Sequence, residues 1–197
     1  MKIKRIIAYI IDFLIISIVA GLIYSIPVFK DDYKNYEEEQ ERYFTSFKET
    51  IKEGKLDREK IIDSEYNLVK STNTLNIIRI GVAFLYFAVL VYFLKGQTLG
   101  QKLLKLRIKM ISGGSLNPGL IVLRGVLVSN ILSNISRIIL VNVSSGNTWY
   151  EYDTMIGGGL SLFFIILYLV AIVRIDGRGL HDLICQTKVI NTKEEEN

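Results

Sequence analysis

The chain contains very few of the residues from which covalent and metal-bound frameworks are built. Its 197 residues include one cysteine, Cys185, and one histidine, His181. A single cysteine excludes an intramolecular disulfide framework, and one histidine with one cysteine falls short of the ligand set of a zinc site. We therefore expect no metal site, and we interpret both residues as ordinary members of the C-terminal segment.

The sequence patterns of catalysis and cofactor binding are missing as well. No Ser/His/Asp set, phosphate-cradling glycine loop or paired-carboxylate site stands out along the chain. We therefore expect a protein that is not an enzyme and that binds no cofactor.

Charge is absent from long stretches of the chain. Ile6–Ile26 is interrupted only by Asp12, and Ile80–Leu94 and Ile156–Val173 carry no charged residue. A helix needs about 20 mostly apolar residues to cross a bilayer, and the second block reaches this length if it begins near Leu75. The first block is too long for a signal peptide and no A-x-A pattern ends it, so we interpret it as an uncleaved span.

A fourth apolar block, Pro118–Val141, qualifies as a span if Arg124 and Arg137 lie near the two interfaces. We predict an all-α membrane protein formed by one domain, 1–197. It has four transmembrane helices, at about residues 6–27, 75–95, 118–141 and 156–174. The connecting parts are an insertion at 29–73, a basic loop at 96–117 and a tail at 175–197.

Acidic residues are missing from one connection and abundant in another. Leu94–Pro118 holds five basic residues and no acid, whereas Phe29–Asn73 holds 12 acids and 9 bases. Because basic loops stay inside, we predict cytoplasmic termini and an extracytoplasmic insertion. Anionic lipid headgroups of the bilayer explain the basic loop, and we expect no nucleic-acid partner because no soluble face combines basic with aromatic residues.

The insertion has the periodicity of two helices. In Lys34–Glu53, aromatic and aliphatic residues recur at spacings of three, four and seven, and Asp57 can cap a second helix. A hairpin of this size buries its own core poorly. Its apolar stripes are expected to pack on each other, on the outer ends of the spans, or on a partner protein.

Two short cytoplasmic segments have the alternation of β-strands. Apolar residues alternate with basic ones in Leu104–Met110, and Gln186–Asn191 is rich in β-formers. Because an isolated strand leaves its backbone groups unpaired, we predict that the two segments pair, with Ile108 near Val189.

Polar residues inside the predicted spans are the candidate functional groups. Asp12 and Arg124 lie at matching depths on helices that both enter from the cytoplasm, which predicts an ion pair between them with Arg5 or His181 as lesser partners. In the third span, Asn130, Asn134 and Arg137 share one helical side and could line a polar path, although such residues also join helices structurally.

These residues and motifs together resemble the RDD family, bacterial membrane proteins named for one arginine and two aspartates. The resemblance covers the chain except Phe29–Asn73. It rests on Arg5, Asp12, "GQTLGQKLLKLRI", Arg124 and "GLHDLICQTKVI", in which His181 precedes Asp182. The family arginine corresponds to Arg5, and its two aspartates correspond to Asp12 and Asp182.

The resemblance implies a multi-pass protein of the bacterial cytoplasmic membrane and leaves two functions open. One is transport of a small ion or solute, most concretely cation/proton exchange at Asp12; because four spans are few for a transporter, it would require a homo-oligomer. The other is a non-enzymatic interaction, accessory or immunity subunit that docks a membrane or extracytoplasmic partner through 29–73.

Overall fold

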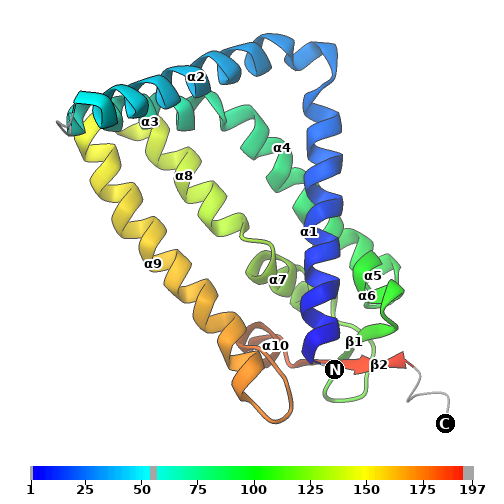
Figure 1. Cartoon of the computed structure of the whole chain (residues 1–197). Helices are drawn as coiled ribbons and strands as arrows, with labels where there is room; N and C mark the ends of the chain where they lie inside the picture. Colours follow the sequence, from blue (N-terminus) through cyan, green and yellow to red (C-terminus); the bar gives the residue numbers. More distant parts are fainter. Residues whose placement is uncertain (1, 54–56, 193–197) are drawn as a thin grey trace.

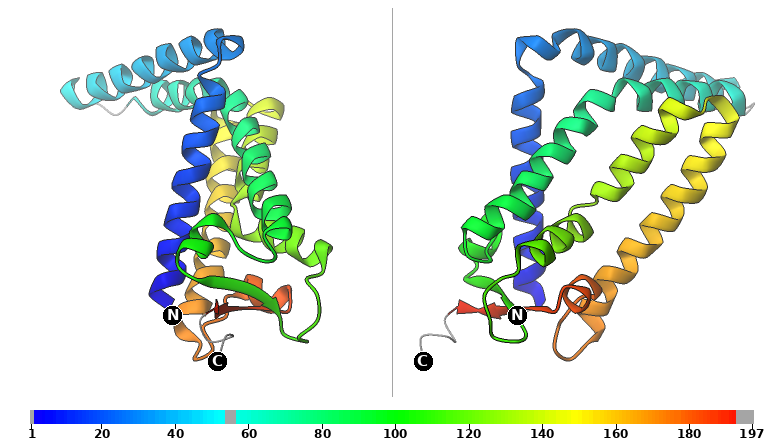
Figure 2. Two further views of the ribbon diagram at one scale, coloured as in Figure 1. Left: turned by 90° about the vertical axis from the view of Figure 1, so that its right-hand side faces the viewer. Right: turned by 180° about the vertical axis from the view of Figure 1, so that it is seen from behind.

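The computed structural model describes residues 2–53 and 57–192 of the chain. The first helix, α1 (Lys2–Tyr24), is almost wholly apolar and ends before Pro27, whose missing N–H prevents the helix from continuing. A short 3-10 turn, η1 (Pro27–Phe29), redirects the chain into α2 (Lys30–Glu53). Helix α2 runs across the ends of the other long helices (Figures 1 and 2).

Three helical segments are long and apolar enough to cross a membrane: α1, Asn73–Phe93 and α9 (Gly146–Val173). The second consists of α4 (Asn73–Phe84), a π-helical stretch η2 (Leu85–Leu90) and α5 (Val91–Phe93). Large apolar side chains remain exposed along these segments, as expected of surfaces that face lipid. The chain is therefore a membrane protein, and α9 begins ten residues before the predicted span at 156–174.

The predicted third span is not one straight helix. It consists of α7 (Pro118–Val128) and α8 (Ile131–Val143), bent by 64° with respect to each other. The break falls at Asn130, whose backbone adopts the left-handed conformation with φ of 57°. By length and composition the pair counts as a fourth span if its two helices form one span, the other arrangement being a re-entrant loop. The predicted helix at about 118–141 is therefore two helices and not one.

Helix α3 (Arg58–Ser71) begins at the predicted cap, where the Asp57 side chain accepts a hydrogen bond from the Lys60 amide at 3.2 Å. It contacts α2 through the Ser46 and Ser64 hydroxyls, 2.9 Å apart. Its other face packs on the ends of α8 and α9, where Trp149 is fully buried. Phe44, Phe47 and Ile51 of α2 stay exposed. Of the three predicted packing modes, the described residues show two, α3 on α2 and α3 on the ends of the spans.

The predicted strand pairing is confirmed. β1 (Leu106–Met110) and β2 (Thr187–Asn191) form an antiparallel pair in which Ile108 lies opposite Val189. Two short helices, α6 (Leu99–Leu103) and α10 (Leu180–Ile184), precede the two strands. The sheet, α6, α10 and the N-terminal end of α1 gather at one end of the molecule, which we call the sheet side; α2 marks the opposite end, the α2 side (Figure 1).

Candidate functional site

Asp12 is buried in α1 and is held by groups that arrive from the second span and the loop after it. Its Oδ1 accepts a hydrogen bond from the Tyr86 hydroxyl at 2.6 Å and another from the Gly100 amide at 2.7 Å. The π-helical stretch η2 carries Tyr86 with its side chain buried toward α1, in keeping with the frequent occurrence of π-bulges at functional positions.

The loop reaches Asp12 because of two local features. Thr98 caps α6, and its side chain and that of Gln101 form a reciprocal capping box. Gly100 then permits close approach, because a Cβ there would lie 2.7 Å from the Asp12 Oδ1 and closer still to the Ala8 carbonyl oxygen. Asp12 thus fastens the loop to α1.

The predicted ion pair between Asp12 and Arg124 was wrong. Arg124 instead donates from Nε and Nη2 to Asp182 Oδ1, each at 3.0 Å. The matching depths of Asp12 and Arg124 were inferred from residue counts along two helices, which do not show that α10 brings a second carboxylate against Arg124. Neither predicted lesser partner, Arg5 or His181, forms a hydrogen bond to Asp12 in the described part of the chain.

Asp182 is the centre of a buried charge cluster that joins three distant segments. It is fully buried and accepts hydrogen bonds from Arg5 on α1 and Arg124 on α7. The Thr187 hydroxyl, at 3.3 Å, and the Gly179 amide, at 3.3 Å, supply further donors from its own segment. Because each carboxylate oxygen has several donors, the buried charge is well compensated.

Asp182 and His181 are neighbours on α10 but differ in charge at neutral pH, because Asp182 is ionised and His181 is neutral. Burial alone would raise the pKa of Asp182, but Arg124 and Arg5 hold the pKa of this carboxyl well below its usual range. Burial lowers the pKa of His181 to about 3, and Arg124 lowers it further. At neutral pH the 3.5 Å contact between His181 Nε2 and Asp182 Oδ2 therefore joins a neutral ring to a carboxylate.

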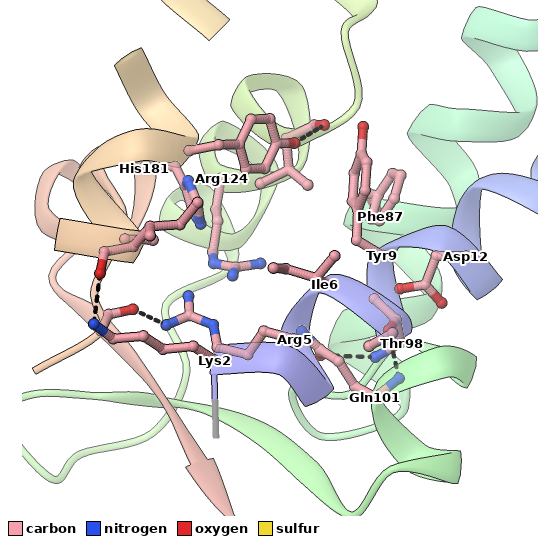
Figure 3. A pocket seen from close by; sticks show the side chains of 16 residues that line it. Lys2, Arg5, Ile6, Tyr9, Asp12, Phe87, Thr98, Gln101, Arg124 and His181 are labelled. Carbon is pink, nitrogen blue, oxygen red and sulfur yellow. Dashed lines mark hydrogen bonds between the residues drawn. The ribbon is translucent and has the colours of Figure 1, made fainter. Parts of the chain in front are cut away.

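A cavity of about 340 Å³ lies on the sheet side between Asp12 and the charge cluster around Asp182 (Figure 3). Asp12 lies near Thr98 at one end of it, and Arg124 and His181 lie at the other. Arg5 also lines the cavity. Four of the residues predicted from the sequence thus line one cavity, and Asp182 is bonded to two of them, Arg5 and Arg124.

A second cavity, of about 500 Å³, lies farther along α1 toward the α2 side and is lined by Asn130 and Asn134. Two members of the predicted polar path therefore share a cavity. Arg137 does not line it; its guanidinium pairs with Asp153 at 3.2 Å on the exposed surface. The two asparagines share one cavity and the arginine lies outside its lining, and a polar path through this cavity stays a prediction.

Four residues line both cavities and form the wall between them: Tyr9, Phe87, Val128 and Tyr168. The rings of Tyr9 and Tyr168 have centroids 5.4 Å apart. The Tyr168 hydroxyl donates to the Val128 carbonyl at 2.9 Å, at the end of α7 where helical carbonyls lack partners.

Several site residues were missed from the sequence. Tyr86 and Tyr168 looked like ordinary apolar residues of their spans, although a tyrosine hydroxyl buried in a membrane needs a hydrogen-bond partner. Arg79, which lines the second cavity, was visible as a charge at the margin of the second block. The Thr98-to-Gln101 spacing is a capping-box pattern that predicts the α6 start.

Metal and nucleophile chemistry find little support in the described residues. No group of three or more His, Cys, Asp or Glu side chains there is arranged to hold a metal ion. Cys185 is fully buried, and burial raises the pKa of its thiol, which keeps it in the unreactive protonated form.

Comparison with known proteins gives one match. The sequence model of the RDD family matches residues 3–186. No curated protein and no solved structure matches the chain.

Proposed function

Because the chain belongs to the RDD family of membrane proteins, we propose that it moves a small ion or solute across the bacterial cytoplasmic membrane. The observation that carries this proposal is the pair of cavities separated by one shared wall of four side chains. A transporter needs a path that is closed at one point and accessible on either side of it, and a few side chains can open by changing rotamers.

Tyr9 and Tyr168 are the moving parts of this wall. Their ring contact and the hydrogen bond from Tyr168 to the Val128 carbonyl hold the two side chains together, and the Tyr168 ring also lies 5.9 Å from the His181 ring between centroids. Val128 ends α7 just before the break, so a change in the bend between α7 and α8 would release Tyr168. The broken span serves as the hinge of the proposed path.

The basic loop on the sheet side supports a cytoplasmic location for that side under the positive-inside rule. The first cavity then opens inward, and a second copy of the chain would complete a path that four spans alone enclose poorly. In the cation/proton version of the proposal, Asp12 carries the proton and exchanges it when Tyr86 and Gly100 release its Oδ1.

Flux measurements on the purified chain in lipid vesicles test the proposal. Sodium, potassium and proton gradients are applied in turn to vesicles with wild type, Asp12→Asn or Tyr168→Ala. We expect flux with wild type, altered coupling to protons with Asp12→Asn and a leak with Tyr168→Ala. Absence of flux under every gradient, or identical flux in protein-free vesicles, would reject transport.

The second candidate function, docking of a partner through α2, is favoured by one observation. Phe44, Phe47 and Ile51 on α2 are 51%, 47% and 66% exposed, and they lie on one helical face. Replacing these three residues by serine leaves the spans intact; loss of a partner with unchanged flux would separate this function from transport.

A further inference from the structure

Helix α2 carries an apolar face that nothing in the described part of the chain covers. Phe44, Phe47 and Ile51 are 51%, 47% and 66% exposed, whereas Ser46 and Thr50, their neighbours along the helix, are buried. Proteins that are surrounded by water rarely leave a cluster of large apolar side chains exposed unless a partner covers it. The face therefore indicates a partner of apolar chemistry.

The geometry of α2 sets the direction in which this face points. Ser46 contacts Ser64 of α3, and Phe47 follows it by one residue, which is about 100° farther round a right-handed helix. Thr50 and Ile51 repeat this relation one turn later. Helix α3 lies behind α2 in Figure 1 and in front of it in the view from behind in Figure 2. A quarter turn onward from the line that faces α3 leads to the underside of α2, toward the long helices.

The opposite side of α2 is polar. Glu38, Arg42, Thr45 and Glu49 share one sector of the helix and are all exposed. Thr45 precedes Phe47 by two residues and is therefore about 200° away from it around the axis. One apolar side toward the spans and one charged side away from them is the pattern of a helix that lies in the plane of a membrane interface.

The apolar face continues the lipid-facing surface of the spans. At the end of α1 and just after it, Leu22, Ile26 and Val28 are 65%, 46% and 82% exposed, and near the start of α9, Met155 is 69% exposed. Helix α2 runs from the end of α1 toward the start of α9 (Figure 1). Its underside thus lies at the level where the apolar surfaces of both spans end.

Aromatic side chains mark the same level at both ends of α2. The ring of Tyr24 lies 6.1 Å from that of Phe29 and 5.9 Å from that of Tyr33 between centroids. Near the start of α9, the rings of Trp149 and Tyr150 lie 6.5 Å apart. Tyrosine and tryptophan gather where a membrane meets water, so both ends of α2 lie at interface depth.

We propose that α2 is an interfacial helix whose apolar face, Phe44, Phe47 and Ile51, inserts into the leaflet on the α2 side of the membrane. Phospholipid covers the face at the boundary between headgroups and acyl chains, a depth of about 5–10 Å. Because α2 has eight acidic and five basic residues, apolar area and not charge holds it there, and neutral phospholipid suffices. A protein partner at this face, the second candidate function, is an outcome that the test separates.

Spin labels on the full chain, in phosphatidylcholine nanodiscs that hold one copy each, measure the surroundings of each face. In a Cys185→Ala background, labelled Phe47→Cys is compared with labelled Thr45→Cys, the matched control on the exposed polar side of the same turn. Collisions of each label with oxygen, which concentrates in lipid, and with a water-soluble nickel chelate are recorded. We expect oxygen to dominate for Phe47→Cys and nickel for Thr45→Cys, and Ile51→Cys should repeat the result of Phe47→Cys one turn farther along.

Two controls keep the result interpretable. The emission of Trp149, the single tryptophan of the chain, should be unchanged in every labelled variant, because this residue is buried where α3 packs on the spans. Adding phosphatidylglycerol should not raise the ratio of oxygen to nickel collisions for Phe47→Cys, since like charges repel. A rise would overturn apolar insertion as the force that holds α2.

The other occupants give distinct results. Collisions dominated by nickel for both Phe47→Cys and Thr45→Cys would overturn the inference and leave the face free for a protein partner. Loss of oxygen access at Phe47→Cys, with spin–spin broadening that appears when two copies share a nanodisc, would overturn it in favour of a second copy. The inference does not depend on transport, because the collisions are measured without an ion gradient.

Discussion

Asp12 is explained by the donors around it. An isolated carboxylate within an apolar helix is costly, but its Oδ1 accepts hydrogen bonds from the Tyr86 hydroxyl and the Gly100 amide. Both donors belong to buried residues. The residue therefore secures the contact between α1, η2 and α6 on the sheet side.

The first prediction compares the effects on Tm of removing the acceptor, Asp12, and of removing one of its donors, the Tyr86 hydroxyl. Asp12→Ala leaves two buried donors unpaired, at about 1–3 kcal/mol for each, whereas Tyr86→Phe keeps the Gly100 bond and leaves one donor unpaired, the Leu99 amide that donates to the Tyr86 hydroxyl at 3.1 Å. We expect Asp12→Ala to lower the Tm of the detergent-purified protein clearly more than Tyr86→Phe. Equal effects of the two changes would show that Asp12 is held by something else.

The second prediction concerns the pH dependence of stability. His181 is the single histidine of the chain, and burial lowers its pKa to about 3 from an ordinary value near 6.5. The unfolded chain therefore binds a proton below pH 6.5 that the folded chain refuses, so the stabilisation is complete above pH 6.5 and is lost as the pH falls toward 3.

Thermal unfolding of wild type and His181→Gln is compared between pH 6.5 and 5. The comparison isolates this group, because Glu65, whose pKa is raised by burial, is common to both proteins and the depressed pKa of Asp182 acts on stability only at lower pH. We expect the free energy of unfolding to fall by up to about 1.4 kcal/mol per pH unit in this window. In His181→Gln the slope should be much shallower. An unchanged slope would place the titration elsewhere.

Which charged residues form the sheet-side site was predictable from the sequence, but which arginine pairs with which carboxylate was not. Arg5, Asp12, Arg124 and Asp182 are charges in or beside apolar blocks, and their rarity marks them. Residue counting gives the depth of a group along its helix. It does not give the rotation of the helix or the return of α10 beneath Arg124, and these decide which carboxylate each arginine meets.

At the scale of elements, the strand pair was predictable because its signal is local. Alternation of apolar and basic residues in β1 fixes one buried face, and pairing satisfies the backbone of both strands. The break in the third span was not predictable, because Ser129 and Asn130 resemble other small polar residues of that helix. The tolerance of asparagine for positive φ was the one available hint.

The third prediction tests the register of the sheet. In a Cys185→Ala background, Ile108→Cys with Val189→Cys should form a disulfide on mild oxidation, because the two positions are direct partners and both are buried. The control is Lys109→Cys with Val189→Cys, whose side chains point to opposite faces. Cross-linking of the control as fast as the test pair would contradict the register.

The fourth prediction tests the break at Asn130, where φ is 57°. Left-handed backbone is tolerated by glycine and costs other residues roughly 1–2 kcal/mol. We expect Asn130→Gly to be more stable than Asn130→Ala in thermal unfolding. A continuous helix would give the opposite order, because glycine is about 1 kcal/mol worse than alanine within a helix.

At the scale of the whole molecule, the long helices spread apart between the sheet side and the α2 side, with α2 across their ends (Figure 2). The three long spans and the apolar block of α7 and α8 were predictable because apolar length is a strong signal. The two cavities and their wall were not, since they depend on how the broken span and α9 lie against α1.

The fifth prediction, which tests the central claim, concerns the wall between the cavities. Ser161 lines the second cavity and Ala171 the first, with Tyr168 between them on α9. In a Cys185→Ala background, Ser161→Cys and Ala171→Cys are labelled in vesicles with a membrane-impermeant thiol reagent from each side in turn. Leu169→Cys, at a residue 49% exposed on the same helix and in neither cavity lining, is the lipid-facing control.

We predict that Ser161→Cys reacts faster from outside and Ala171→Cys faster from the cytoplasmic side, while Leu169→Cys stays unlabelled. Adding Tyr168→Ala should speed the labelling of both cavity positions from the opposite side, because the wall is then open. Labelling rates that Tyr168→Ala leaves unchanged would contradict a path through the two cavities.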